Sequence, residues 1–198
     1  MGVQELALRP PFAGSEEQVT PHDEDAALVD RYRAGEPAAF EQLVRKYQRS
    51  IYFLMARQVG DRDEAAELTQ RAFIKAMQGL AGFRGAAQFR TWLYRIAVNL
   101  GLNYLRDHAK FAREESLEAR ASAGPPAVDQ LVAAEDARRL RAAVTRLPRK
   151  QRLTLELRVY EDLSFREVAQ ILGTSEGAAK VNYHYAVKRL KQLLGEES

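Results

Sequence analysis

The chain has 198 residues, 46% of them hydrophobic and 29% charged, a composition typical of a globular protein with apolar cores in one or two small domains. It contains no cysteine, which excludes a disulfide framework and thiolate metal sites, and no apolar run is long enough to cross a membrane. The net charge is only +3, but residues 139–194 hold 12 Lys and Arg against 5 Asp and Glu, whereas residues 1–25 hold one arginine against six acids.

The N-terminal part of the chain is predicted to be a short tail followed by a helical domain. Residues 1–24 carry three prolines, are acidic and lack apolar periodicity, which predicts a disordered acidic tail. From Asp25 onward apolar residues recur every three to four positions, which predicts four helices with one shared core over residues 25–110. The third of these helices is expected to bury Leu68, Ala72, Phe73, Ala76, Met77 and Leu80.

The fourth predicted helix carries a stripe of aromatic, cationic and amide side chains. Trp92, Arg95, Asn99, Asn103 and Arg106 recur at three-to-four spacing along it. Such groups can stack on an unpaired base, hold phosphates and form hydrogen bonds with base edges. The stripe therefore indicates single-stranded DNA as a ligand, although Trp92 suits a core position equally well.

A linker is predicted to separate this domain from a second one. The segment "EARASAGPPAVDQ" is rich in small residues and contains a Pro-Pro pair, which is typical of a linker, and we assign the linker to residues 111–128. Helical periodicity then resumes and continues to the end of the chain. We therefore expect an all-α protein of two small helical domains joined by a flexible linker, the second domain spanning residues 129–195.

The second domain is predicted to end in a helix-turn-helix. Ser164 and Glu167 have the spacing of a capping box, Gly173 stands where a helix must end with positive φ, and Ser175 can cap the next helix. A small residue at Ala169 allows the two helices to cross closely. This pattern is typical of DNA-binding helix-turn-helix motifs, although plain helical hairpins share it.

The last helix has one apolar face and one polar face. Projection at 100° per residue puts Ala179, Tyr183, Ala186, Val187, Leu190 and Leu194 on the core side. The outward side carries Gly177, Val181, His184, Tyr185, Lys188 and Gln192, which would meet a major groove. The flanks carry cations suited to phosphates, namely Lys180, Arg189 and Lys191.

With both halves considered, residues 25–194 resemble the extracytoplasmic-function (ECF) sigma factors of bacterial RNA polymerase, in the sigma-70 superfamily. The segment "FRTWLYRIAVNLGLNYLRD" is similar to that family's promoter-melting and minus-ten-reading segment. The segment "LPRKQRLTLELRVYEDLSFREVAQILGTSEGAAKVNYHYAVKRLKQLL" is similar to its minus-thirty-five-reading domain. Two such motifs in this order across a linker are more specific than either alone.

The resemblance implies three sets of site residues. The segment "DEAAELTQRAFIKA" is similar to the one that docks on the clamp helices of the polymerase, which implies core binding by Glu64, Glu67, Leu68, Gln70 and Phe73. The melting segment implies minus-ten DNA contacts by Phe89, Arg90, Thr91, Trp92, Tyr94, Arg95, Asn99, Asn103 and Arg106. The last helix is expected to contact minus-thirty-five DNA through Gly177, Lys180, Val181, His184, Tyr185 and Lys188.

Some positions depart from the family pattern. The family usually has Glu-Asp at Ala66-Glu67, an acid at Arg71, and arginines at Asn182 and Tyr185. We therefore expect core docking with altered details and a promoter sequence unlike the common one. The resemblance further implies three partners, namely polymerase core, promoter DNA and a separate anti-sigma factor, and it implies a cytoplasmic location, no cofactor and no membrane insertion.

Two other classes of protein are alternatives to this interpretation. A stand-alone helix-turn-helix regulator would bind its operator without polymerase. An enzyme is disfavoured because the sequence shows no nucleophile–base set, no phosphate-binding glycine loop and no metal-like spacing among its histidines, His22, His108 and His184.

Overall fold

The structure is a computed structural model that describes residues 21–83, 85, 87–114 and 131–195, and every regular element within these ranges is helical. The elements are α1 (Pro21–Arg33), α2 (Pro37–Val59), α3 (Arg62–Gly79), the 3-10 helix η1 (Leu80–Gly82), α4 (Phe89–Glu114), α5 (Leu131–Thr145), α6 (Arg149–Val159), α7 (Phe165–Leu172) and α8 (Glu176–Leu194). The predicted all-α class is confirmed.

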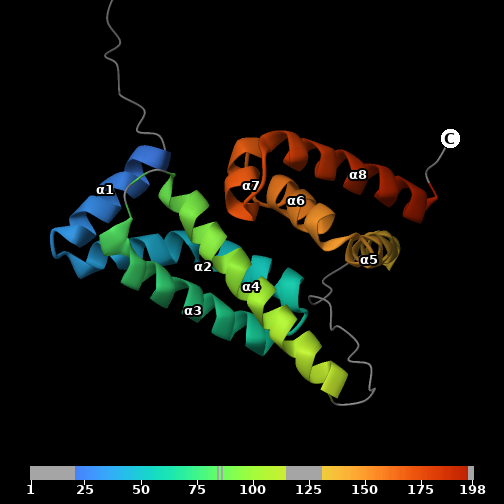
Figure 1. Cartoon of the computed structure of the whole chain (residues 1–198), viewed down its shortest axis with the longest axis horizontal. Helices are drawn as coiled ribbons and strands as arrows, with labels where there is room; N and C mark the ends of the chain where they lie inside the picture. The colour runs from blue at the N-terminus through green and yellow to red at the C-terminus, as the bar shows by residue number, and fades with distance from the viewer. Residues whose placement is uncertain (1–20, 84, 86, 115–130, 196–198) are drawn as a thin grey trace, which may run out of the picture.

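The N-terminal half is a bundle of α1 to α4, in which α4 crosses over α2 and α3 (Figure 1). Gly60 ends α2 in the left-handed region at φ 76°, which glycine adopts without steric cost. The carboxylate of Asp61 then caps α3 by accepting hydrogen bonds from the backbone N–H groups of Asp63 and Glu64. The core of the bundle contains Leu43, Ile51, Leu54, Met55, Leu68, Leu80 and Leu93.

The C-terminal half contains the predicted helix-turn-helix, formed by α7 and α8. Ser164 and Glu167 form the capping box, with the Ser164 hydroxyl accepting from the Glu167 N–H at 3.2 Å and the Glu167 carboxylate accepting from the Ser164 N–H at 2.7 Å. Gly173 ends α7 at φ 62°, and the Ser175 hydroxyl caps α8 by accepting from the N–H of Ala178 at 3.1 Å. The capping interactions inferred from the sequence are all present.

The two halves pack against each other. Helix α7 lies against α4 (Figure 1), and one apolar cluster extends from the bundle into α6 and α7. The members that α6, α7 and the turn between them contribute are Leu153, Leu157, Leu163, Val168, Ala169 and Ile171. A second, smaller cluster joins α5, α6 and α8. The sequence predicted two domains on a linker but did not predict this closed arrangement.

Several expected boundaries and burial assignments differ from the structure. Helix α1 begins at Pro21, inside the expected tail, and α4 continues to Glu114, inside the expected linker, while residues 1–20 and 115–130 lie outside the described residues. Met77, expected in the core, is 42% exposed because it lies on the outer side of α3. Val159 and Tyr160 are also exposed, at the C-terminal end of α6.

Candidate nucleic-acid interface

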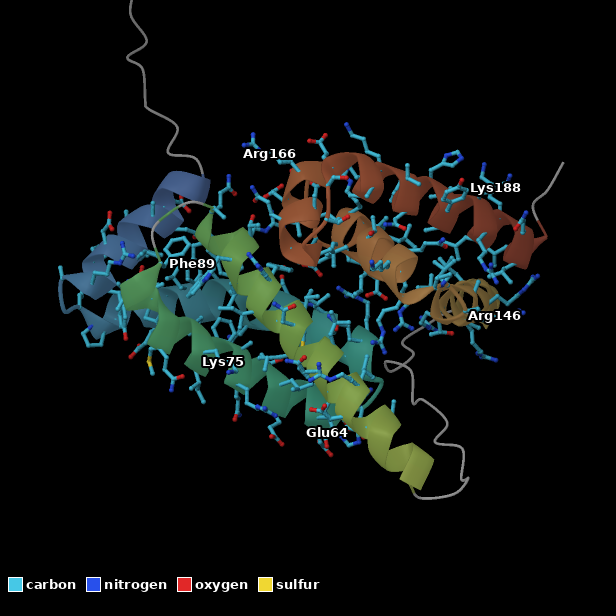
Figure 2. All side chains as sticks on the ribbon, in the orientation of Figure 1. Glu64, Lys75, Phe89, Arg146, Arg166 and Lys188 are labelled. Carbon is cyan, nitrogen blue, oxygen red and sulfur yellow. The ribbon has the colours of Figure 1, made fainter. Side chains whose placement is uncertain are left out.

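Helix α8 presents the predicted minus-thirty-five residues to solvent. All six residues of that set are exposed, and Val181 and Tyr185 expose about half of their surface although they are apolar or aromatic. The helix is held by its opposite side, where Ala179, Ala186 and Leu190 are buried. Lys188 points from α8 away from the rest of the molecule (Figure 2). The closed arrangement therefore leaves this face free.

The charges of α8 are arranged along this exposed face. Lys180 donates to the carboxylate of Glu176 one turn earlier, at 2.7 Å, and this hydrogen bond lowers the pKa of Glu176. Lys188 makes no ion pair with any residue that the structure describes. Tyr183 is half-buried and packs edge-on against Phe165, with ring centroids 5.5 Å apart, as the predicted core position requires.

The predicted minus-ten residues of α4 fall into an exposed group and a covered group. The exposed stripe consists of Arg95, Asn99, Asn103 and Arg106. These residues lie three or four positions apart and so share one side of the helix, where their guanidinium and amide groups are open to solvent. This side of α4 fits contact with phosphates and base edges.

Trp92 belongs to an aromatic cluster at the start of α4. Its ring lies 4.9 Å from Phe83 and 5.9 Å from Phe89 between centroids. A Cβ at Gly79 would lie 3.0 Å from the Trp92 ring, so α3 and the indole are in close contact. Trp92 is half-buried, which corresponds to the core alternative that the sequence left open.

The loop before α4 is tied to α1. The guanidinium of Arg33 donates to the carbonyl oxygen of Leu80 at 3.1 Å and also to the carbonyl oxygen of Phe83. These bonds hold the chain between α3 and α4, and they fix where the aromatic cluster and the first turn of α4 lie.

Three of the predicted minus-ten residues are buried in this conformation. Phe89, Thr91 and Tyr94 are 3%, 2% and 1% exposed. Phe89 packs in the aromatic cluster, and Tyr94 faces the C-terminal half. DNA cannot reach these three side chains in the closed arrangement. Their contact with DNA stays a prediction for a different arrangement of the two halves.

Glu161, in the turn between α6 and α7, joins the two halves. One carboxylate oxygen accepts from the Arg57 guanidinium of α2 at 2.6 Å, and the other accepts from the Tyr94 hydroxyl at 2.5 Å. The guanidinium of Arg90 donates to the backbone carbonyl of Glu161. Burial and the hydrogen bond to Glu161 raise the pKa of Tyr94. Removing one partner of a buried ion pair costs about 3–5 kcal/mol because the other charge is left without a partner, so the closed form depends on this cluster staying intact.

A second buried carboxylate lies close to this cluster. Glu156 of α6 is 2% exposed, and burial raises its pKa, opposed by the charges of Arg57 and Arg152. The Arg152 Nε atom lies 4.0 Å from Glu156, too far for a hydrogen bond. Neither Glu156 nor Glu161 was predicted from the sequence, since an acid among arginines in a helical pattern and an acid in a polar turn both usually lie in solvent.

The predicted polymerase-binding residues lie on α3, but only part of the set reaches the surface. Glu67 and Gln70 are exposed and Glu64 is half-exposed, whereas Leu68 and Phe73 are buried in the bundle core. The buried pair can support the shape of this face but cannot contact a partner while the bundle stays folded.

Two apolar residues missing from that set are exposed on the same helix. Ile74 is 48% and Met77 42% exposed. Figure 2 shows Glu64 and Lys75 on the side of the molecule opposite Lys188. A large partner on α3 and a duplex on α8 would therefore approach from different sides.

Other kinds of site lack support in the described ranges. Among these residues no group of three or more His, Cys, Asp or Glu side chains is placed to hold a metal ion. No helix in the described part of the chain has the length and apolarity needed to span a bilayer. The shallow groove between α3 and α4 is lined by charges of both signs, including Glu67, Arg71, Arg106 and Asp107.

Two family models match the chain, one in its N-terminal half and one in its C-terminal half. The model described as sigma-70 region 2 matches residues 43–111, and the model described as sigma-70, region 4 matches residues 137–190.

Curated relatives extend the match to most of the chain. The RNA polymerase sigma-H factor of Pseudomonas aeruginosa is 33% identical over 182 residues, covering 87% of this chain and 94% of that protein. The ECF RNA polymerase sigma-E factor of Escherichia coli K12 is 34% identical over 166 residues, covering 79% of this chain and 86% of that protein.

Solved structures agree with the fold. CnrH in complex with the cytosolic domain of CnrY matches with a TM-score of 0.67 and 25% identity, covering 89% of this chain and 100% of that one. The sigma factor RpoE of Bartonella quintana, solved with the anti-sigma factor NepR, matches with a TM-score of 0.68 and 20% identity, covering 80% of this chain and 98% of that one. At this identity the likeness concerns the fold alone.

Proposed function

The chain belongs to the ECF group of the sigma-70 family of RNA polymerase sigma factors, and on this premise we propose how its surfaces divide the work of initiation. A sigma factor binds core polymerase and directs it to promoters. The proposal concerns which residues of this chain carry each contact.

The α8 face reads the minus-thirty-five duplex. Val181, His184 and Tyr185 are exposed on the N-terminal half of the recognition helix, where base edges in a major groove are met first. Lys180 and Lys188 supply positive charge beside them. The observation that supports this assignment best is the exposure of all six residues of the set while the opposite side of the helix, at Ala179, Ala186 and Leu190, is buried against its own domain.

The exposed stripe of α4 holds minus-ten DNA. Arg95, Asn99, Asn103 and Arg106 offer cations and amides along one side of a single rigid helix. Arg90 and Tyr94 would add to this surface once the C-terminal half moves away from α4, whereas Trp92 is covered by residues of its own bundle and contributes only the part of its ring that is already exposed. Because each reading surface is small, the two gain affinity by being tethered to the same polymerase.

The exposed side of α3 docks on polymerase core. Glu67 and Gln70 suit basic and polar partner groups, and Ile74 and Met77 provide apolar contact area beside them. We extend the predicted set by these two apolar residues and regard Leu68 and Phe73 as supports of the helix. Domain limits of 25–110 and 129–195 remain our proposal for the two functional units.

Regulation is expected to come from a separate protein. One of the structurally similar proteins is a sigma factor solved with an anti-sigma factor, and we extend this kind of partner to the present chain. Purification of the tagged chain from its own host, followed by identification of the proteins that block transcription when added back, tests this.

Reconstituted transcription tests the proposal as a whole. Core polymerase with the chain should initiate at specific sites that core alone does not use. A mobility-shift assay separates the alternative, because a stand-alone regulator would shift promoter DNA equally well without core. Specific binding that is independent of core, together with no initiation, would refute the sigma-factor mechanism for this chain.

A further inference from the structure

The turn that joins α6 to α7 places one acidic residue of the C-terminal half against three residues of the N-terminal half. Glu161 is 6% exposed, and it receives hydrogen bonds from Arg57, Tyr94 and Arg90. The Arg57 guanidinium also lies 4.5 Å from the ring centroid of the neighbouring Tyr160. We call Glu161 together with Arg57, Arg90 and Tyr94 the Glu161 clasp.

The backbone of this turn is built to present Glu161. Asp162 takes φ 47°, a value that few residues other than glycine adopt, but that Asp tolerates. The N–H of Leu163 bonds back to the carbonyl of Leu157 at 3.2 Å, and Arg158 donates to the carbonyl of Leu163. The turn is therefore closed by its own bonds, which leave the carboxylate of Glu161 to the other half of the chain.

Two members of the clasp belong to the residues expected to contact minus-ten DNA. Arg90 and Tyr94 use their guanidinium and hydroxyl groups on Glu161. The carboxylate of Glu161 presents to Tyr94 the same kind of acceptor as a phosphate oxygen, and the backbone carbonyl of Glu161 occupies the guanidinium of Arg90. In the closed chain, Glu161 therefore occupies donors that DNA would otherwise use, and Tyr94 is only 1% exposed.

We propose that the Glu161 clasp is an autoinhibitory contact, in which Glu161 competes with unpaired promoter DNA for the start of α4 until the two halves separate. The clasp is selective, because the α8 face stays exposed in the same arrangement. The sixteen residues between α4 and α5 can span at most about 55 Å, so the chain permits separation. The inference rests on the proposed minus-ten assignment of α4, and its first test needs no DNA.

The first test measures opening of the free full-length chain. Because the chain has no cysteine, single cysteines introduced at the exposed positions Gln42 of α2 and Gln192 of α8 accept a donor–acceptor dye pair. Glu161→Gln keeps the shape of the side chain and removes its charge. Asp162→Asn, at the exposed neighbouring residue, is the matched control because it removes the same charge outside the clasp.

We expect Glu161→Gln to shift the closed-to-open ratio about tenfold or more toward the open form, seen as lower energy transfer, while Asp162→Asn matches the parent chain. Arg57→Ala, which breaks the clasp from the other half, should have the same effect, and it keeps the proposal testable if one variant folds poorly. Equal transfer in all four chains would overturn the clasp, whatever the transcription assays show.

The second test measures the affinity of the chain for DNA. The probes are a labelled single-stranded oligonucleotide from just upstream of a start site that the chain uses and a duplex from the minus-thirty-five position of the same promoter. Glu161→Gln should bind the single strand about tenfold more tightly and the duplex unchanged. If Glu161→Gln opens the chain but does not bind the single strand more tightly, Glu161 does not compete with DNA and the proposal is overturned. Weaker binding of the duplex would show that the substitution damages the C-terminal half, and it would also count against the proposal.

Discussion

Substitution of Tyr185 by alanine separates reading of the promoter from folding of the domain. The side chain is 53% exposed, and the one aromatic contact described for it is with His184, whose ring centroid lies 5.9 Å away. Its loss should therefore change the free energy of unfolding by no more than about 0.5 kcal/mol. A contact with a base edge or a thymine methyl group is worth about 1–3 kcal/mol, which corresponds to a loss of about 5- to 150-fold in promoter affinity.

The assay is binding of the polymerase holoenzyme to a promoter and to variants with single base changes in the minus-thirty-five element. Tyr185→Ala should lose both affinity and discrimination at one base position. Lys191→Ala is the control, since it removes an exposed cation on the flank of the same helix and should weaken binding to all sequences alike, with a shallower salt dependence. Unchanged discrimination in Tyr185→Ala would refute the assignment of this face.

Three further predictions concern α3, the bundle core and the buried carboxylate. Glu67→Lys should weaken core binding by at least about tenfold in a pull-down titration, whereas Glu41→Lys on α2, the same reversal at an exposed acid, should not. Gly101→Ala should destabilise the chain by about 1–3 kcal/mol in urea denaturation. The new Cβ would lie 2.3 Å from the amide oxygen of Gln58 and 3.0 Å from the amide carbon of Gln58. Adding Gln58→Ala should therefore restore part of the lost stability. Glu156→Gln should stabilise the chain more at pH 8 than at pH 5, measured by urea denaturation. Burial raises the pKa of Glu156 above 4.5, so the protonated side chain contributes to folding stability below that pH. This contribution is lost as pH rises through the folded-state pKa, and glutamine, which does not ionise, avoids the loss.

Each of these predictions has an outcome that contradicts it. Equal core affinity of Glu67→Lys and Glu41→Lys would remove α3 from the proposed docking face. A Gly101→Ala chain as stable as the parent would show that the Gln58 side chain moves away at little cost. A Glu156→Gln chain with the same pH dependence as the parent would show that this carboxyl does not titrate differently on folding.

The local structure was largely predictable because short-range signals determine it. Ser164, Glu167, Gly173 and Ser175 act within a few residues of their own positions, and the structure has each of them in the expected capping role. The outward face of α8 followed from helical periodicity alone, since its inward side has to be apolar. Fold class and the helix-turn-helix were therefore accessible from the sequence.

What the sequence did not indicate depends on contacts between distant segments. Glu161 has the pattern of a solvated loop acid, and only its approach to Arg57, 104 positions earlier, makes it a buried one. Tyr94 resembled an exposed DNA-contacting residue for the same reason. Met77 was misassigned because periodicity gives the direction of a helix face but not the width of its buried part, and α3 buries only a narrow stripe.

The most direct measurement is the position of transcript starts when the purified chain is added to purified core polymerase on genomic DNA. We expect new starts, each preceded by two short sequence elements at a constant separation. Tyr185→Ala should alter the requirement at the upstream element only. Starts identical to those of core alone, in the presence of folded chain, would contradict the claim that this protein directs initiation by holding a promoter at two places.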